Sequence, residues 1–197
     1  MDIIHFSEHQ YRERLLELHT KERIAFASAC AERLFSAYVK FNALSKRGDA
    51  NALRSVLSKL WGDLMGEVMS IRDLNDCLET VMNLIPQEGE AEWIPEQAPA
   101  EDASAALAYA LRCRQNGSEE EAAWAARRAY EATDYYVNNL NSLLLRSRAS
   151  EEDIISHPII QKELGRQLRD MDELRRGVIS IEKLRERAQQ DSKDFLP

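Results

Sequence analysis

Four histidines and three cysteines are the side chains in this sequence that most often bind metals or act as nucleophiles. His9 and His19 are ten residues apart, nearly three helical turns, which is too far for them to share one metal ion. The Glu-x-x-His pairs with which helical bundles hold two metal ions do not occur. We therefore expect no metal site and interpret the histidines as surface residues: His5, His9, His19 and His157.

Patterns typical of nucleophilic or phosphate chemistry are also missing. The sequence has no Gly-x-Ser-x-Gly turn, and none of its cysteines has a histidine near it along the chain. The seven glycines are scattered singly, so they form no glycine-rich phosphate loop. We therefore expect no cofactor and identify no catalytic residue. The favoured interpretation is a protein that is not an enzyme.

A polar cluster inside an Ala-rich helix is the first candidate binding site. Asn138, Asn139 and Asn141 follow Tyr135 closely. Asparagine is a poor residue within a helix, because its side chain competes for backbone hydrogen bonds. Tyr135, Asn138 and Asn139 could line a polar pocket between helices. They could also mark a solvent face or a local kink, which is the more common reason for such residues.

Trp93 is the second candidate binding residue. It lies between Arg72 and Arg112, where the chain carries nine carboxylates without one Lys or Arg. A tryptophan in such a segment either packs back onto the core or is presented to a partner. Packing onto the core is the favoured interpretation, because an exposed indole ring lowers solubility.

The composition limits the classes of function. The chain has 197 residues and a net charge of −8, whereas nucleic-acid-binding proteins need a concentrated basic face. No apolar run approaches the roughly 18–20 residues of a membrane span, and the first residues do not form a signal peptide. Three widely spaced cysteines are typical of buried thiols in a reducing compartment. We expect a cytoplasmic protein that binds neither nucleic acid nor membrane.

Helix start and stop signals recur along the chain, and β-branched alternation is absent. Ser7 with Gln10 forms a capping box, Pro86 prevents a helix from continuing, and Gly117 ends another. These signals predict an all-α fold in a single domain over residues 1–197. We expect about seven helices around a central helix at 21–46, with a Pro-rich acidic crossing loop at 86–101 and Asp102 opening the next helix.

The helix at 21–46 is expected to be central because fifteen of the 23 residues from 22 to 44 are apolar. Only a narrow stripe is polar. Arg33 lies just beside this stripe, so we expect it to be half-buried and to need a carboxylate partner in a structural ion pair. The polar stripe consists of Ser28, Glu32, Ser36 and Lys40.

A last long helix, beginning at Pro158, is predicted to carry one apolar seam. The seam either packs within the chain, which is favoured, or pairs with the same helix of a second copy in a homodimer. Gly165 and Gly177 each weaken this helix by about 1 kcal/mol relative to alanine. The seam residues are Leu164, Leu168, Met171, Leu174, Val178, Ile181, Leu184 and Ala188.

Four segments together resemble one known family. They are 24–41, with Cys30-Ala31-Glu32-Arg33-Leu34 at its centre; 57–61; the acidic crossing into Glu101-Asp102-Ala103; and 157–163. In these segments the chain is similar to the YjaG-like family of bacterial proteins, a domain of unknown function. The resemblance implies a compact helical domain in a stand-alone cytoplasmic protein, and it brings no activity, cofactor or catalytic residue. His157 departs from the asparagine that the family usually has before this proline.

Two functions of different class remain open. The first is a non-enzymatic interaction or scaffold protein, which the missing catalytic residues and the uneven charge favour: residues 1–60 carry +3 and residues 61–130 carry −9. The alternative is a small-molecule-binding protein or enzyme with an inter-helix pocket near Tyr135, Asn138 and Asn139.

Overall fold

The computed structural model describes residues 3–87, 89, 92–144 and 150–196. This part of the chain contains nine helices and no strand, which confirms the all-α prediction and exceeds the expected seven helices. The helices are α1 (Glu8–Leu16), α2 (Thr20–Ser45), α3 (Ala50–Leu64), α4 (Ile71–Leu84), α5 (Gln97–Asn116), α6 (Glu119–Leu144), α7 (Glu151–Ile155), α8 (Pro158–Arg175) and α9 (Ile181–Lys193).

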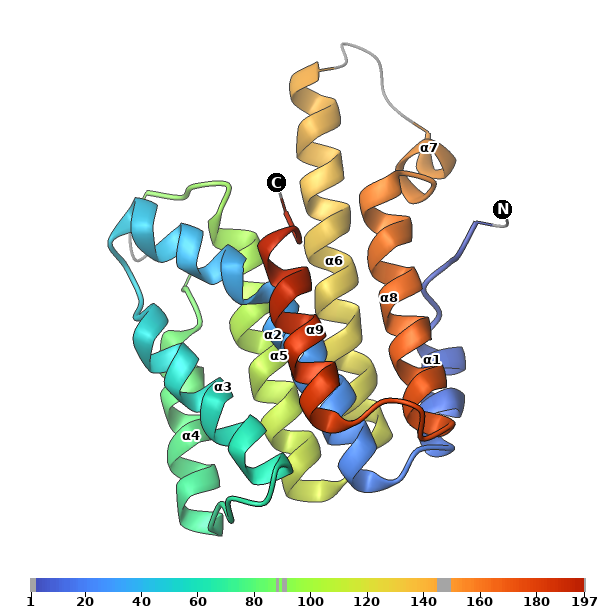
Figure 1. The fold of residues 1–197 in the computed structure, drawn as a ribbon. Coiled ribbons are helices and arrows are strands. Elements are labelled where there is room, and N and C mark those ends of the chain that lie inside the picture. Colours follow the sequence, from blue (N-terminus) through green and yellow to red (C-terminus); the bar gives the residue numbers. More distant parts are fainter. Residues whose placement is uncertain (1–2, 88, 90–91, 145–149, 197) are drawn as a thin grey trace.

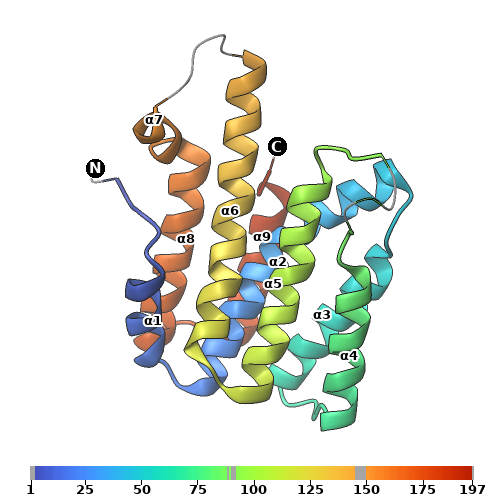
Figure 2. The ribbon, with the colours of Figure 1, turned by 180° about the vertical axis from the view of Figure 1, so that it is seen from behind.

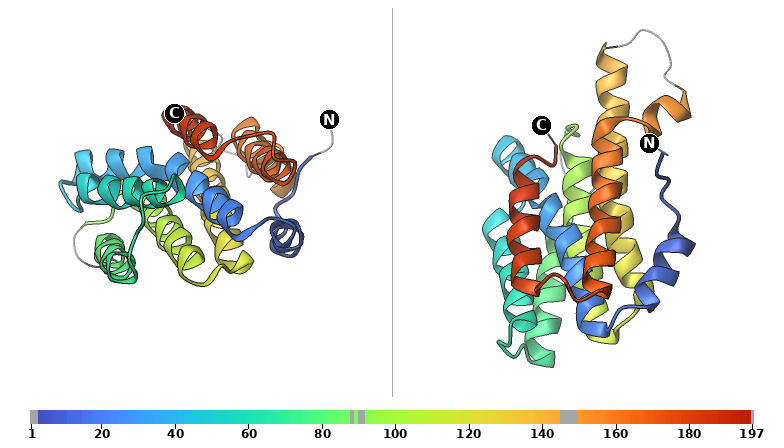
Figure 3. Two further views of the ribbon diagram at one scale, coloured as in Figure 1. Left: turned by 60° about the horizontal axis from the view of Figure 1, so that its bottom comes forward. Right: turned by 45° about the vertical axis from the view of Figure 1, so that its right-hand side comes forward.

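Helix α2 lies at the centre of the bundle, as its composition predicts (Figures 1 and 3). It packs against α3, α5, α6, α8 and α9, and every residue from Ile24 to Leu34 is buried. Helices α5 and α6 cover one of its sides, and Figure 2 shows them together with the outer hairpin of α3 and α4. A helix that is apolar on most of its circumference must be enclosed in this way.

The prediction of one continuous last helix is wrong. It breaks into α8 and α9 because Gly177 adopts a φ of +62°, a left-handed conformation that ends a helix and that other residues rarely adopt. The seam side chains Leu164, Met171, Leu174 and Leu184 are buried within this chain. Val178 is 60% exposed, and Leu168 and Ile181 are partly buried. A homodimer through the last helix stays a prediction.

The acidic crossing is shorter than the predicted 86–101. Helix α5 begins at Gln97, so Pro99 lies in its first turn, where a missing backbone N–H breaks no intrahelical bond. Asp102 does not open the helix but is buried in its second turn. Trp93 is 55% exposed, so the interpretation that it packs onto the core is wrong.

His157 has a structural role at the start of α8. Its side chain accepts a hydrogen bond from the backbone N–H of Ile159 at 3.3 Å, as the N-cap residue of the helix. Asparagine is among the best N-cap residues because its side chain makes the same kind of bond. The residue that the resemblance implies at this position would therefore cap the helix in the same way.

Candidate functional site

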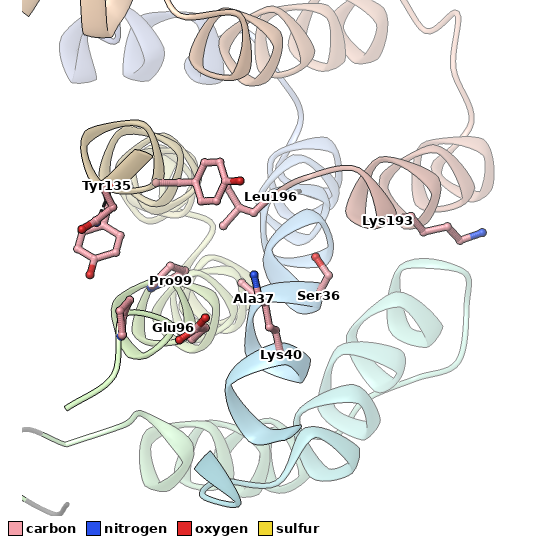
Figure 4. Close-up of a pocket in the computed structure, with 11 residues that line it drawn as sticks. Ser36, Ala37, Lys40, Glu96, Pro99, Tyr135, Lys193 and Leu196 are labelled. Atoms are coloured by element: carbon pink, nitrogen blue, oxygen red, sulfur yellow. Dashed lines mark hydrogen bonds between the residues drawn. The ribbon is translucent and has the colours of Figure 1, made fainter. Parts of the chain in front are cut away.

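A pocket of about 310 Å³ lies between α2, α5, α6 and the segment that follows α9 (Figure 4). Its volume is at the lower end of the range for small-molecule sites. Most of the lining is apolar, and the polar groups come from four separate parts of the chain. The lining residues are Ser36, Ala37, Lys40, Pro95, Glu96, Pro99, Tyr135, Tyr136, Asn139, Lys193 and Leu196.

The structure places two of the four predicted binding residues in this pocket. Tyr135 and Asn139 line it, whereas Asn138 is exposed and does not. Both asparagines donate to the carbonyl four residues earlier, Asn138 to Asp134 at 2.9 Å and Asn139 to Tyr135 at 2.8 Å. These bonds explain how the two residues are tolerated inside a helix.

Trp93 lies outside the pocket lining, although Pro95, two residues later, belongs to it. The indole ring is therefore not part of the pocket wall. Its exposure makes Trp93 a separate surface feature.

The hydroxyl group of Tyr135 is buried, and no described group meets the geometry of a hydrogen bond to it. Burial raises the pKa of this hydroxyl, the nearby Asn139 side chain lowers it, and the charges of Glu96 and Glu101 raise it further. The hydroxyl therefore keeps its proton at neutral pH. An unpartnered buried donor of this kind is costly unless a ligand or water accepts from it.

The charged groups of the pocket are two lysines and one glutamate. The Lys40 side chain, on α2, has no carboxylate within 4.0 Å in the described part of the chain. The Lys193 amino group donates to Gln190 at 3.1 Å and points away from the other lining side chains (Figure 4). Glu96 lies at the N-terminus of α5, where the helix dipole is positive. Lys40 is therefore the cation that a ligand in the pocket can reach.

The sequence contained a signal for part of this site. Ser36 and Lys40 end the polar stripe of the central helix, and both line the pocket. The start of the same stripe is used differently, because the buried Glu32 accepts from Trp61 Nε1 at 2.9 Å and from Arg54 at 2.6 Å. The contributions of Pro95, Pro99 and Leu196 depend on tertiary packing and have no local signal.

A second polar cluster is buried between α2 and α8. Arg33 is fully buried, not half-buried as expected. Its guanidinium group donates from Nε to Glu163 at 3.1 Å and from Nη1 to Asp170 at 2.7 Å. All three side chains are 1% exposed. The predicted structural ion pair is confirmed, with two carboxylate partners in place of one.

Further residues extend this cluster to α9. Arg187 donates to Asp170 at 2.7 Å, and Gln167 donates to Glu163 at 2.8 Å. Burial raises the pKa of Glu163, while Arg33 lowers it. Burial also raises the pKa of the Cys30 thiol, which accepts from Arg33 at 3.4 Å. The thiol therefore stays protonated, and the cluster fixes helices in place more than it presents reactive groups.

Comparison with known proteins places the chain in a family. Residues 10–194 match the sequence profile described as "Protein of unknown function (DUF416)". The chain belongs to this family. A crystal structure of a DUF416 family protein from Shewanella baltica OS155 has a similar fold, with a TM-score of 0.75 and 20% sequence identity over 93% of each chain. No curated protein matches the sequence.

The DUF416 description carries no activity, so the chemistry of this member depends on its own side chains. Within the described ranges, no three His, Cys, Asp or Glu residues are grouped so that they could hold a metal ion. None of the described helices combines the length and apolar character that crossing a bilayer requires. The lining of the pocket offers hydrogen-bonding groups, the accessible cation of Lys40 and an apolar wall.

Proposed function

We propose that this DUF416 family member binds a small organic molecule in the pocket between α2, α5, α6 and the segment after α9. The observation that supports this proposal best is the buried hydroxyl of the pocket-lining residue Tyr135, which makes no hydrogen bond of normal geometry among the described residues, although the Asn139 side chain lies close to it. Ligand pockets typically combine an apolar wall with a few such polar groups.

A ligand screen with two matched variants tests the proposal. Binding of a ligand to the native state raises the melting temperature, and the rise increases with the logarithm of the ligand concentration once it exceeds the dissociation constant. We expect compounds that stabilise the wild-type protein to stabilise Asn138→Ala equally and Asn139→Ala less. The two residues are adjacent and make the same backbone bond, but only Asn139 lines the pocket. Equal responses of both variants, or no stabilising compound, would refute the proposal.

A protein–protein interaction role is the second candidate, and the exposure of Trp93 favours it. Aromatic residues of this kind are enriched in the centres of protein interfaces. The partner proposed here is a second copy of the chain, contacted through Trp93 and not through the apolar seam for which the sequence left a homodimer open. Light scattering of the wild type and of Trp93→Ala tests it. A wild-type mass of one chain at all concentrations, or a dimer unaffected by the substitution, would exclude Trp93 as a dimer contact.

Two narrower assignments belong to the same proposal. The segments at 24–41, 57–61 and 157–163 support placing the chain among the YjaG-like members of the family. That resemblance and the three buried free cysteines support a cytoplasmic, bacterial protein. The net charge of −8 and the lack of a long apolar run support a protein that binds neither nucleic acid nor membrane. Fractionation of cells that express the untagged protein tests its location.

A further inference from the structure

We infer that the pocket selects an organic monocarboxylate with a compact apolar body. The inference depends on the function proposed above, since it names the class of ligand for the same pocket. The compact size follows from the pocket volume of about 310 Å³, which is at the lower end of the range for small-molecule sites.

Two hydrogen-bond donors favour an acceptor group on the ligand. The Lys40 side chain is exposed and has no carboxylate within 4.0 Å in the described chain. The buried Tyr135 hydroxyl makes no hydrogen bond of normal geometry there, although the Asn139 side chain lies close to it. A carboxylate accepts several hydrogen bonds, and charge-assisted bonds to it are about twice as strong as neutral ones. A carboxylate on the ligand therefore suits either of these donors.

The remaining wall fits an apolar body. Ala37, Pro95, Pro99 and Leu196 line the pocket, and their surfaces carry no charge. Apolar area removed from water contributes about 25 cal/mol per Å². A ligand with a carboxylate at one end and a ring or branched chain at the other would use both parts of the pocket.

Glu96 limits the charge that the pocket accepts. Its carboxylate is part of the lining, so it repels an anion, and the repulsion grows with the charge of that anion. Lys40 and the positive end of α5 oppose this repulsion. The balance favours a single negative charge and disfavours phosphates, which carry up to two.

Three matched probes test the class of ligand by isothermal titration calorimetry on the full chain. Phenylacetate, phenylacetamide and 2-phenylethylamine share a ring and side-chain length and differ in charge. We expect phenylacetate to bind at least about tenfold more tightly than the amide, and the amine to bind most weakly. Lys40→Met should lower the affinity for phenylacetate to that for the amide and leave the amide unchanged. Glu96→Gln should tighten the binding of phenylacetate.

The outcomes separate the ligand class from the proposed function. Equal or tighter binding of the amide or the amine, or an unchanged preference in Lys40→Met, would overturn the inference and leave a small-molecule pocket. If none of the three probes binds, the charges of the compounds found in the ligand screen decide: neutral or cationic compounds overturn the inference, and monocarboxylates that depend on Lys40 support it. A screen without any stabilising compound refutes the proposed function and the inference together.

Discussion

Replacing Arg33 with methionine should destabilise the protein strongly. The substitution keeps an unbranched side chain but leaves Glu163 and Asp170 without their shared cation, and both are 1% exposed. Asp170 retains Arg187 at 2.7 Å, whereas among the described residues Glu163 retains Gln167 at 2.8 Å and Arg166 at 3.9 Å and no closer cation. The loss therefore falls mainly on Glu163.

The expected loss of unfolding free energy is about 3–5 kcal/mol, the cost of removing one partner from a buried ion pair. For a chain of 197 residues, this corresponds to a decrease in melting temperature of about 6–20 °C. The loss is a large fraction of the roughly 5–15 kcal/mol that stabilises a typical protein. Urea unfolding monitored by circular dichroism measures it.

The loss should also depend on pH. Burial already raises the pKa of Glu163, and without Arg33 the pKa should rise further. A carboxyl group with a raised folded-state pKa stabilises the fold in its protonated form, and this stabilisation disappears as the pH rises through that pKa. Arg33→Met should therefore differ more from the wild type at pH 8 than at pH 5.

Two further variants complete the test of Arg33. Arg33→Met/Glu163→Met should recover at least about 2 kcal/mol, because a buried ion pair can be replaced by apolar residues at little cost. Arg12→Met removes a 41% exposed arginine that pairs with Glu119 and Glu120, and it should cost less than about 1 kcal/mol. An Arg33→Met protein within about 1 kcal/mol of the wild type at pH 8 would show that the buried cluster is described wrongly.

Three further predictions concern a buried acid, a glycine pair and an exposed indole. Burial raises the pKa of Asp102 to about 7, against the effect of Arg128. Wild-type stability should therefore fall as the pH rises from 5 to 8, by up to about 2.5 kcal/mol. Asp102→Asn should flatten this dependence in urea titrations, and an unchanged slope would assign it to another group. Gly177→Ala should lower the free energy of unfolding by about 1 kcal/mol, because φ is +62° there although the space around the new methyl group is open. Gly165→Ala, in open space within α8, should raise the free energy of unfolding by about 0.5–1 kcal/mol. Chemical denaturation of the two variants distinguishes these opposite signs. In a Trp61→Phe/Trp124→Phe protein, acrylamide should quench the fluorescence of the 55% exposed Trp93 efficiently, and weak quenching would show that the indole is covered.

Helical periodicity and capping residues were sufficient to predict most of the architecture. The central position of α2 follows from its apolar circumference, and the need of Arg33 for a carboxylate follows from its place on that helix. Its partners could not be predicted, because Glu163 and Asp170 are more than a hundred residues away and resemble surface acids locally. The break at Gly177 was underestimated, since a glycine within an apolar seam is compatible with either a weakened helix or a turn.

The candidate site was predicted less completely, because a local sequence pattern does not show which of two neighbouring residues faces a pocket. Tyr135 and Asn139 were found because asparagine inside a helix is unusual, but this argument also selected Asn138, which faces solvent. One helical position is a rotation of about 100°, and the pattern alone could not choose between the two neighbours. Lys40 was visible only as part of a polar stripe, and it reaches the pocket because α5 and the segment after α9 enclose that end of α2.

The packing of α9 against α2 has a consequence for the order of folding. Residues 46–180 separate the two helices along the chain, yet they form one of the larger helix–helix contacts of the bundle. Bringing distant segments together costs loop-closure entropy before any contact is gained, so such contacts tend to form late. Because Leu196 completes the pocket wall just beyond α9, we expect helical structure to appear during refolding before the protein acquires its capacity to bind a ligand.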